Sequence, residues 1–307
     1  MSTSAPAWLA AALQGQRASL ARAVTAVEEH TPDAAHVLQA VYPRIGRAQV
    51  VGFTGLPGAG KSTLIGLCIA EALRRGLSVG VVAVDPTSPL SGGSVLGDRI
   101  RMLSTASDSR VFVRSLAARG HLGGLSAAAA GVVDVLDAAG KDLILVESVG
   151  VGQSETEIRE LVQLTVLVCA PGMGDDVQMI KAGLLEIANV FAVNKSDLPE
   201  AHGLIQMLRA AGQLADAPAP PVIATSAVTG AGVAELLDLL RARHAQAPAP
   251  DLERRRRLRY SLQARALEKA HLRLAGSQTP RLDRLCDDVL AGNLGFDEAA
   301  EALLVFR

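Results

Sequence analysis

Residues 50–63, Val50-Val51-Gly52-Phe53-Thr54-Gly55-Leu56-Pro57-Gly58-Ala59-Gly60-Lys61-Ser62-Thr63, decide the fold of this chain. The stretch begins as an apolar strand, continues as the phosphate-binding pattern G-x-x-x-x-G-K-[ST], and leads into helical spacing over residues 64–73. In this context, backbone N–H groups and a helix N-terminus can bind phosphate oxygens. An ordinary glycine-rich turn is disfavoured, because the strand and the helix that the motif requires are both present.

The conserved chemistry of such a loop assigns separate roles to its lysine and its serine. Lys61 is expected to reach the β- and γ-phosphates of a nucleotide, and the Ser62 hydroxyl is expected to ligate Mg²⁺. The expected phosphate-binding residues are Gly55, Leu56, Pro57, Gly58, Ala59, Gly60, Lys61, Ser62 and Thr63.

The composition indicates a globular chain with one large domain or two smaller ones. It has 307 residues, of which 49% are hydrophobic, and a formal net charge of −1, which argues against a general binder of nucleic acid or of anionic membranes. Cys68, Cys169 and Cys286 are scattered and form no C-x-x-C pair, as expected in a reducing compartment. Residues 1–20 lack the basic start and continuous apolar stretch of a signal peptide, and no apolar run approaches the ~18 residues of a membrane span, so neither export nor membrane insertion is expected. The expected location is the cytoplasm.

Strand-like and helix-like segments alternate after the phosphate-binding loop. Strands are expected at 78–84, 110–114, 142–147, 164–170, 190–194 and 222–225, and helices at 97–106, 124–139, 176–188, 200–212 and 231–243. Several strands are apolar throughout, which is typical of a largely parallel sheet with helices on both faces. The expected fold class is therefore α/β, a P-loop NTPase with helical extensions at both ends. Its ligand is expected at the carboxyl ends of the strands.

Both extensions are predicted to be helical. Residues 6–46 carry two runs of helical spacing on either side of Thr31-Pro32-Asp33, which predicts two helices. A Pro-rich stretch at 246–250 precedes three expected helices at 251–274, 280–291 and 296–306. The predicted division is an N-terminal helical extension at 1–47, a GTPase domain at 48–245 and a C-terminal arm at 251–307. The run Arg254–Arg257 is interpreted as a solvated helix face rather than a binding patch.

Asn194-Lys195-Ser196-Asp197 follows a predicted strand and matches the N-K-x-D element of GTPases. A carboxylate at its last position can accept two hydrogen bonds from guanine, and adenine does not offer donors in that pattern. Thr225-Ser226-Ala227 matches the next guanine-contacting element. The expected guanine-binding residues are Asn194, Lys195, Asp197, Ser226 and Ala227.

Carboxylates at strand ends predict a magnesium site. Glu147 ends an apolar strand where P-loop proteins place an acidic residue, and Gly150 follows where an N–H can sense the γ-phosphate. Asp85 and Asp98 are further candidates, although Asp98 could instead cap the helix after it. The predicted Mg²⁺ shell is Ser62, Asp85, Asp98 and Glu147, and the predicted catalytic residues are Lys61, Asp98 and Glu147.

The residue after Gly150 is Val151, so the glutamine that orients water in Ras-type enzymes is absent from this position. Hydrolysis by the chain alone is therefore expected to be slow.

Longer strings resemble a known family, the methylmalonyl-CoA mutase-associated GTPases, which are chaperones of adenosylcobalamin-dependent acyl-CoA mutases and relatives of nickel-insertion GTPases. The resemblance covers about residues 48–243 and is carried by GLPGAGKST (55–63), VDPTSPLSGGSVLGDRIRM (84–102), RSLAARGHLGG (114–124), ILVESVGVGQSE (144–155), PGMGDDVQMIKAG (171–183) and NKSD (194–197). It implies a homodimer that binds GTP, GDP and Mg²⁺ and meets adenosylcobalamin only through a partner mutase.

The same resemblance assigns roles to individual residues. Asp85, Asp98 and Glu147 fall on the family's magnesium-shell and catalytic carboxylates, and residues 171–183 fall on a switch that couples the nucleotide state to the mutase. Arg254–Tyr260 resembles the start of the family's C-terminal arm, but Tyr260 and Leu262 stand where many members have tryptophan. The expected switch residues are Gly150, Gly174, Asp175, Gln178 and Lys181.

The alternatives to this function are a metal-insertion GTPase, a P-loop kinase and a pure binding scaffold. A metal-insertion GTPase would usually carry a His-rich tract or a C-x-C near the nucleotide, and the sequence has neither. A P-loop kinase would not need N-K-x-D, and a comparison of GTP with ATP binding separates it from a GTPase. A pure binding scaffold is disfavoured, because Lys61, Ser62 and the acidic residues are intact.

Overall fold

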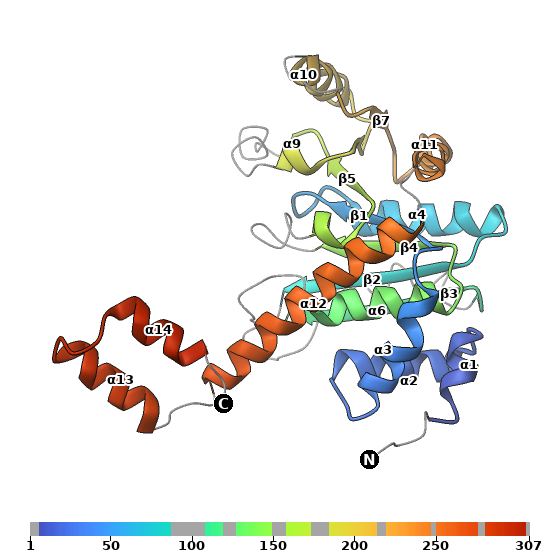
Figure 1. The fold of residues 1–307 in the computed structure, drawn as a ribbon. Coiled ribbons are helices and arrows are strands. Elements are labelled where there is room, and N and C mark those ends of the chain that lie inside the picture. Colours follow the sequence, from blue (N-terminus) through green and yellow to red (C-terminus); the bar gives the residue numbers. More distant parts are fainter. Residues whose placement is uncertain are drawn as a thin grey trace. The chain divides into compact units, whose positions relative to one another are not determined.

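The computed structural model describes residues 6–86, 108–118, 127–148, 158–172, 184–213, 219–246, 250–275 and 280–304. The chain forms two compact units, residues 1–260 and residues 261–307. The first unit contains a parallel sheet and the second is helical (Figure 1). The division predicted from the sequence, with boundaries near 47 and 250, stays a prediction.

The first unit is built on a seven-stranded sheet in the order β3-β2-β4-β1-β5-β6-β7. Its strands are β1 (Gln49–Thr54), β2 (Val79–Pro86), β3 (Val111–Ala118), β4 (Leu143–Ser148), β5 (Leu164–Cys169), β6 (Val190–Val193) and β7 (Val222–Ala224). All neighbouring strands pair in parallel, so their carboxyl ends lie at one edge of the sheet. The predicted α/β fold class and the predicted strands are confirmed.

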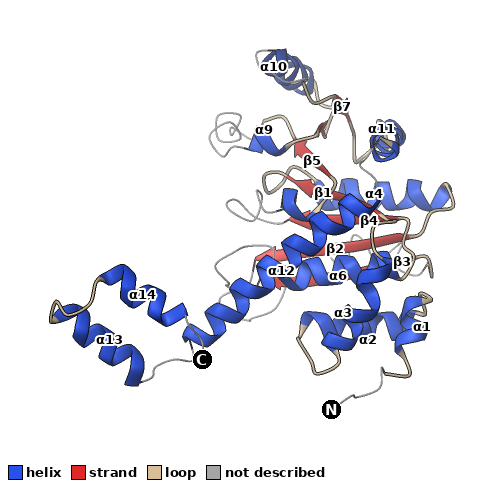
Figure 2. Ribbon diagram, in the orientation of Figure 1, coloured by secondary structure: helices blue, strands red, loops and turns tan. Residues whose placement is uncertain are grey.

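The sheet is buried on both faces, as its continuous apolar strands predict. Every residue of β1 and β4 is buried. The helices of this layer are α4 (Lys61–Arg74), α6 (Ala127–Ala138), α9 (Leu184–Ile187), α10 (Ala201–Gln213) and α11 (Val233–Ala245). One core cluster joins α6 to one face of the sheet, a second joins α4 and α11 to the other, and a third joins α10 to β5 and β6. Figure 2 shows these helices around the sheet.

The N-terminal segment contains three α-helices, α1 (Leu9–Leu13), α2 (Arg17–Glu28) and α3 (Ala34–Val41), followed by the 3-10 turn η1 (Tyr42–Arg44). The prediction of two helices was therefore wrong. The first predicted helix is broken at Gly15, whose φ of +78° is a left-handed conformation that glycine adopts at little cost.

Another glycine lets this N-terminal layer pack closely on α6. A Cβ at Gly131 would lie 2.4 Å from Cγ1 of Val27 in α2, so a larger residue at this position would push the two helices apart. The N-terminal helices pack on the first unit's sheet layer, since their apolar residues share one core cluster with α6.

The last three helices are α12 (Pro250–Ala275), α13 (Pro280–Leu290) and α14 (Phe296–Leu304), close to their predicted bounds. In the second unit, a hydrogen bond of 2.5 Å from Arg281 Nη2 to the carbonyl oxygen of Ala302 ties α13 to α14. Among the described residues, none of the helices combines the length and the apolar character needed to cross a membrane.

Candidate nucleotide-binding site

The phosphate-binding loop lies between β1 and α4, at the centre of the sheet edge where the strands end. Two of its glycines are required by close contacts. Gly55 has a φ of +138°, and a Cβ there would lie 2.2 Å from the carbonyl oxygen of Val168 in β5. Gly60 has a φ of +89°, and its Cβ would lie 2.3 Å from Nδ2 of Asn194. The loop is therefore held against the ends of β5 and β6 at a distance that only glycine permits.

Lys61 is the first residue of α4, and its side chain folds back over the loop. The residue is only 6% exposed, and Nζ donates hydrogen bonds to the carbonyl oxygens of Gly55 at 2.7 Å and Leu56 at 3.2 Å. A buried ammonium group at a helix N-terminus adds its charge to the positive end of the helix dipole. Both charges favour an anion in the loop.

Ser62 and Glu147 bring two oxygen ligands together beside the loop. The Ser62 hydroxyl donates a hydrogen bond of 2.6 Å to Oε1 of Glu147, which is buried at the end of β4. Glu147 pairs in register with Phe53 of β1, so the parallel pairing of β1 and β4 sets this contact. A hydroxyl and a carboxylate are hard oxygen ligands of the kind that Mg²⁺ prefers, and the pair therefore fits the predicted metal.

Asn194 joins the phosphate-binding loop to the loop after β7. The residue is 1% exposed; its Nδ2 donates a hydrogen bond of 2.9 Å to the carbonyl oxygen of Ala59, and its Oδ1 accepts one of 3.0 Å from the N–H of Ala227. The backbone of Asn194 also donates to the carbonyl oxygen of Cys169 in β5. One buried amide thus fixes the spacing between the two halves of the predicted site.

The carboxylate of Asp197 is exposed beside this junction. Its Oδ1 accepts a hydrogen bond from the Ser226 hydroxyl, whose oxygen in turn accepts from the N–H groups of Val228 and Thr229 at 3.3 Å each. Lys195 has a φ of +57°, an uncommon conformation for a residue with a side chain. These contacts orient Asp197 while its surface stays open to solvent, as a base-recognition carboxylate requires.

The structure brings together the described residues of the phosphate-binding loop, Glu147 and the N-K-x-D element at one edge of the sheet. Asp85 lies at the end of β2, but its side chain is outside the described part of the structure. The other predicted residues outside the described ranges are Asp98, Gly150, Gly174, Asp175, Gln178 and Lys181. Their roles stay predictions.

An unpredicted cluster of charges lies between α12 and α6. Arg257 of α12 is buried and forms ion pairs with Asp134 and with Asp137, the latter with a distance of 2.7 Å between Nη1 and Oδ2. Asp137 also accepts hydrogen bonds from the N–H groups of Gly46 at 2.6 Å and Ala48 at 2.9 Å, just before β1. The two carboxylates outweigh the effect of burial and raise the pKa of Arg257 above its ordinary value.

The prediction that Arg254–Arg257 forms a solvated helix face was therefore wrong for Arg257. The sequence carries one signal of the buried cluster, namely two aspartates three residues apart in the otherwise apolar helix 127–138. Burial of Tyr42 and the nearby charge of Asp134 raise the pKa of this tyrosine to about 12, so its phenol stays protonated at neutral pH.

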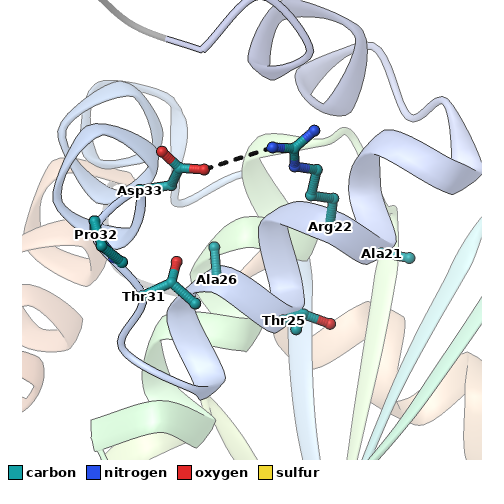
Figure 3. Close-up of a pocket in the computed structure, with 7 residues that line it drawn as sticks. All are labelled: Ala21, Arg22, Thr25, Ala26, Thr31, Pro32 and Asp33. Atoms are coloured by element: carbon teal, nitrogen blue, oxygen red, sulfur yellow. Dashed lines mark ion pairs between the residues drawn. The ribbon is translucent and has the colours of Figure 1, made fainter. Parts of the chain in front are cut away.

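A hollow of about 510 Å³ lies between α2 and the turn before α3 (Figure 3). Arg22 and Asp33 face each other across it at 3.8 Å, and the Arg22 guanidinium lies 4.7 Å from the centre of the Trp8 ring. These helices pack on the face of the sheet opposite α4, so the hollow is separate from the phosphate-binding loop. Within the described ranges, no group of three or more His, Cys, Asp or Glu side chains could hold a metal ion.

Comparison with known proteins identifies the family of this chain. The family model of the methylmalonyl-CoA mutase-associated GTPase MeaB matches residues 20–278. A GTPase of Pyrococcus horikoshii is 49% identical over 74% of each chain, and the mouse methylmalonic aciduria type A homolog, a mitochondrial protein, is 33% identical over 95% of this chain and 77% of its own. A crystal structure of an LAO/AO transport system kinase is 27% identical, covers 98% of each chain and superposes with a TM-score of 0.70. The chain therefore belongs to the family of methylmalonyl-CoA mutase-associated GTPases and is a GTPase whose ligands are GTP and GDP.

Proposed function

We propose that this GTPase depends on Mg²⁺ and acts as a chaperone of an adenosylcobalamin-dependent acyl-CoA mutase, gating cofactor loading and protecting or reactivating the mutase. The family model supports a mutase partner. The observation that carries the nucleotide half of the proposal is the buried Asn194 amide, which ties the phosphate-binding loop to the guanine-side loop. A GTP molecule that bound both loops would meet a site whose spacing is already set.

The residues of the loop would divide the work of binding and charge stabilisation. Backbone N–H groups of residues 55–63 would bind the phosphates, and Lys61 would leave its two carbonyl partners for β- and γ-phosphate oxygens, which are stronger acceptors because they are charged. Ser62 and Glu147, with Asp85 and Asp98, would hold Mg²⁺. When bound, this ion would neutralise charge that develops on the phosphate oxygens during hydrolysis.

Asp197 would recognise the guanine N–H groups, with Ser226 holding it in place. Asn194, Lys195 and Ala227 would complete the base side of the site. Because Asp197 already accepts from a hydroxyl that is itself held by two backbone donors, its orientation costs little on binding.

The proposed switch is residues 171–183, with Gly174, Asp175, Gln178 and Lys181, together with Gly150. Its start directly follows β5, whose Val168 carbonyl lies against Gly55 of the phosphate-binding loop. This contact supports a role for the segment after β5 in sensing the nucleotide. A partner that prefers one arrangement of such a segment must in turn alter the nucleotide chemistry.

We also propose a homodimer and a cytoplasmic location. The second unit exposes large apolar residues that a partner copy could cover, namely Leu262, Leu267, Leu290 and Phe296. All three cysteines are free, which suits a reducing compartment.

GTP hydrolysis by the purified protein tests the nucleotide half of the proposal. We expect slow turnover, because Val151 replaces the water-orienting glutamine, and loss of turnover when Mg²⁺ is chelated. Lys61→Ala should lower the rate by about 100-fold or more, since it removes a charge aimed at the phosphates. Circular dichroism would show that the variant is folded. Fast hydrolysis, or hydrolysis that survives chelation, would contradict the assignment.

A further inference from the structure

Residues 158–161 form a short helix. In the chain, this helix lies between Gly150, the proposed γ-phosphate sensor, and β5. A Cβ added to Gly52 of β1 would lie 2.8 Å from Cδ1 of Ile158 and 3.0 Å from Cγ2 of Val162. Ile158, the first described residue of this helix, and Val162, which directly follows it, therefore pack on β1 at Gly52, two residues before the strand ends.

Arg256 of α12 binds the carboxyl end of the same helix. Its Nη1 donates to the carbonyl oxygens of Arg159 at 3.2 Å and Glu160 at 3.4 Å, and its Nη2 donates to that of Val162 at 2.8 Å. Its Nε and Nη2 also donate to the two oxygens of Glu253, at 3.2 and 2.7 Å. These five contacts match the five N–H donors of a guanidinium group.

Arg256 therefore caps the carboxyl end of this helix from a different helix, α12. The last carbonyl groups of a helix lack intrahelical donors and carry the negative end of its dipole. A guanidinium group satisfies both needs, and Glu253, which is buried, orients it. Arg256 is thus built to hold the end of this helix in one place.

The neighbouring residue fixes α12 itself. Arg257 forms ion pairs with Asp134 and Asp137 of α6. The backbone at Arg256 is therefore fixed and cannot move together with residues 158–161. A change in the position of residues 158–161 would therefore strain or break the Arg256 contacts.

We propose that Arg256 is a positioning residue for GTP hydrolysis, which holds residues 159–162 beside β1 and thereby couples the nucleotide site to α12. The proposal rests on the proposed function, because it takes the loop after β1 to bind the phosphates of GTP. Coupling of this kind is reciprocal, so a partner that acts on α12 would also change the nucleotide site.

The test compares Arg256→Ala with Arg255→Ala. Arg255 is the adjacent residue of α12, is exposed, and carries the same charge, so its removal controls for charge and helix propensity. Hydrolysis at saturating GTP should fall about fivefold in Arg256→Ala and stay at the wild-type rate in Arg255→Ala. The GTP dissociation constant should change less than about twofold in either variant, because neither side chain touches the phosphate-binding loop.

Hydrogen exchange of the full-length protein supplies a second readout. Amides of residues 158–163 and 250–260 should exchange differently with GDP and with a non-hydrolysable GTP analogue in the wild type and in Arg255→Ala. In Arg256→Ala the difference at 250–260 should disappear, with the melting temperature used to confirm that the protein is folded.

Three results would overturn the inference. The first is that Arg256→Ala hydrolyses GTP at the wild-type rate and keeps the exchange difference. The second is that both variants lose the same share of the rate. The third is that Arg256→Ala loses as much GTP affinity as it loses rate. Failure of the wild-type protein to bind GTP would instead contradict the proposed function.

Discussion

At the scale of single residues, the proposed selection of guanine over adenine rests on Asp197. Asp197→Ala should abolish the preference for GTP over ATP, which in sites built around substrate donors can reach about 10⁴-fold, because the acceptors of the guanine N–H groups are lost. Isothermal titration calorimetry with both nucleotides measures the effect. Glu200→Ala is the matched control, since this exposed carboxylate lies three residues further along the chain. Equal affinity of the wild type for ATP and GTP would rule out the role of Asp197.

The positions of the proposed binding residues could be predicted from the sequence, because each motif is short and lies at a strand end, so that local chain geometry decides where it falls. Asn194 was predicted as a base-binding residue, but its bridge from Ala59 to Ala227 depends on how the four strands β1, β5, β6 and β7 pair. The burial of Arg257 was missed for a related reason: its partners precede it by 123 and 120 positions. Periodicity within a helix does not reveal such partners.

At the scale of elements, the Arg257 cluster holds α12 to α6 and to the chain before β1. Arg257→Ala should lower the free energy of unfolding by about 3–5 kcal/mol, because it leaves two buried carboxylates without their cation. Urea denaturation measures the change, and Arg255→Ala should stay within about 0.5 kcal/mol of the wild type. A loss in Arg257→Ala no greater than that of the control would show that the buried ion pairs do not stabilise the fold.

The order of helices and strands was predictable because several strands are apolar throughout and the stretches between them contain glycine and proline. The break between α1 and α2 was not. Helical spacing resumes soon after Gly15, so the pattern alone predicts one continuous helix. In the structure Gly15 has a φ of +78°, a left-handed conformation that separates α1 from α2.

At the scale of the whole molecule, the apolar surface of the second unit predicts self-association. The exposed fractions of Leu262 and Leu267 are 61% and 69%, which is costly in water unless a second copy covers them. Light scattering should show a dimer at micromolar concentration. Leu262→Glu combined with Leu267→Glu should give a monomer that still binds GTP, because both positions lie outside the unit that contains the site. A wild-type monomer, with and without GTP, would refute the dimer.

Fold and nucleotide specificity can be predicted from motifs and periodicity, but the mutase partner cannot. The proposal of a mutase partner rests on family membership, because a partner-binding surface has no pattern of its own in a single sequence. The same limit applies to the switch at 171–183, whose role rests on its resemblance and on its place after β5.

GTP hydrolysis in the presence of the mutase tests the central claim most directly. Phosphate release and adenosylcobalamin transfer would be followed together, for the protein alone and with a candidate acyl-CoA mutase, using wild type and Lys181→Ala. We predict that the mutase raises the hydrolysis rate by about tenfold or more and that transfer differs between GTP and GDP. Lys181→Ala should bind GTP normally but lose most of the stimulation. An unchanged rate with the mutase, together with identical transfer in both nucleotide states, would contradict the proposed chaperone function.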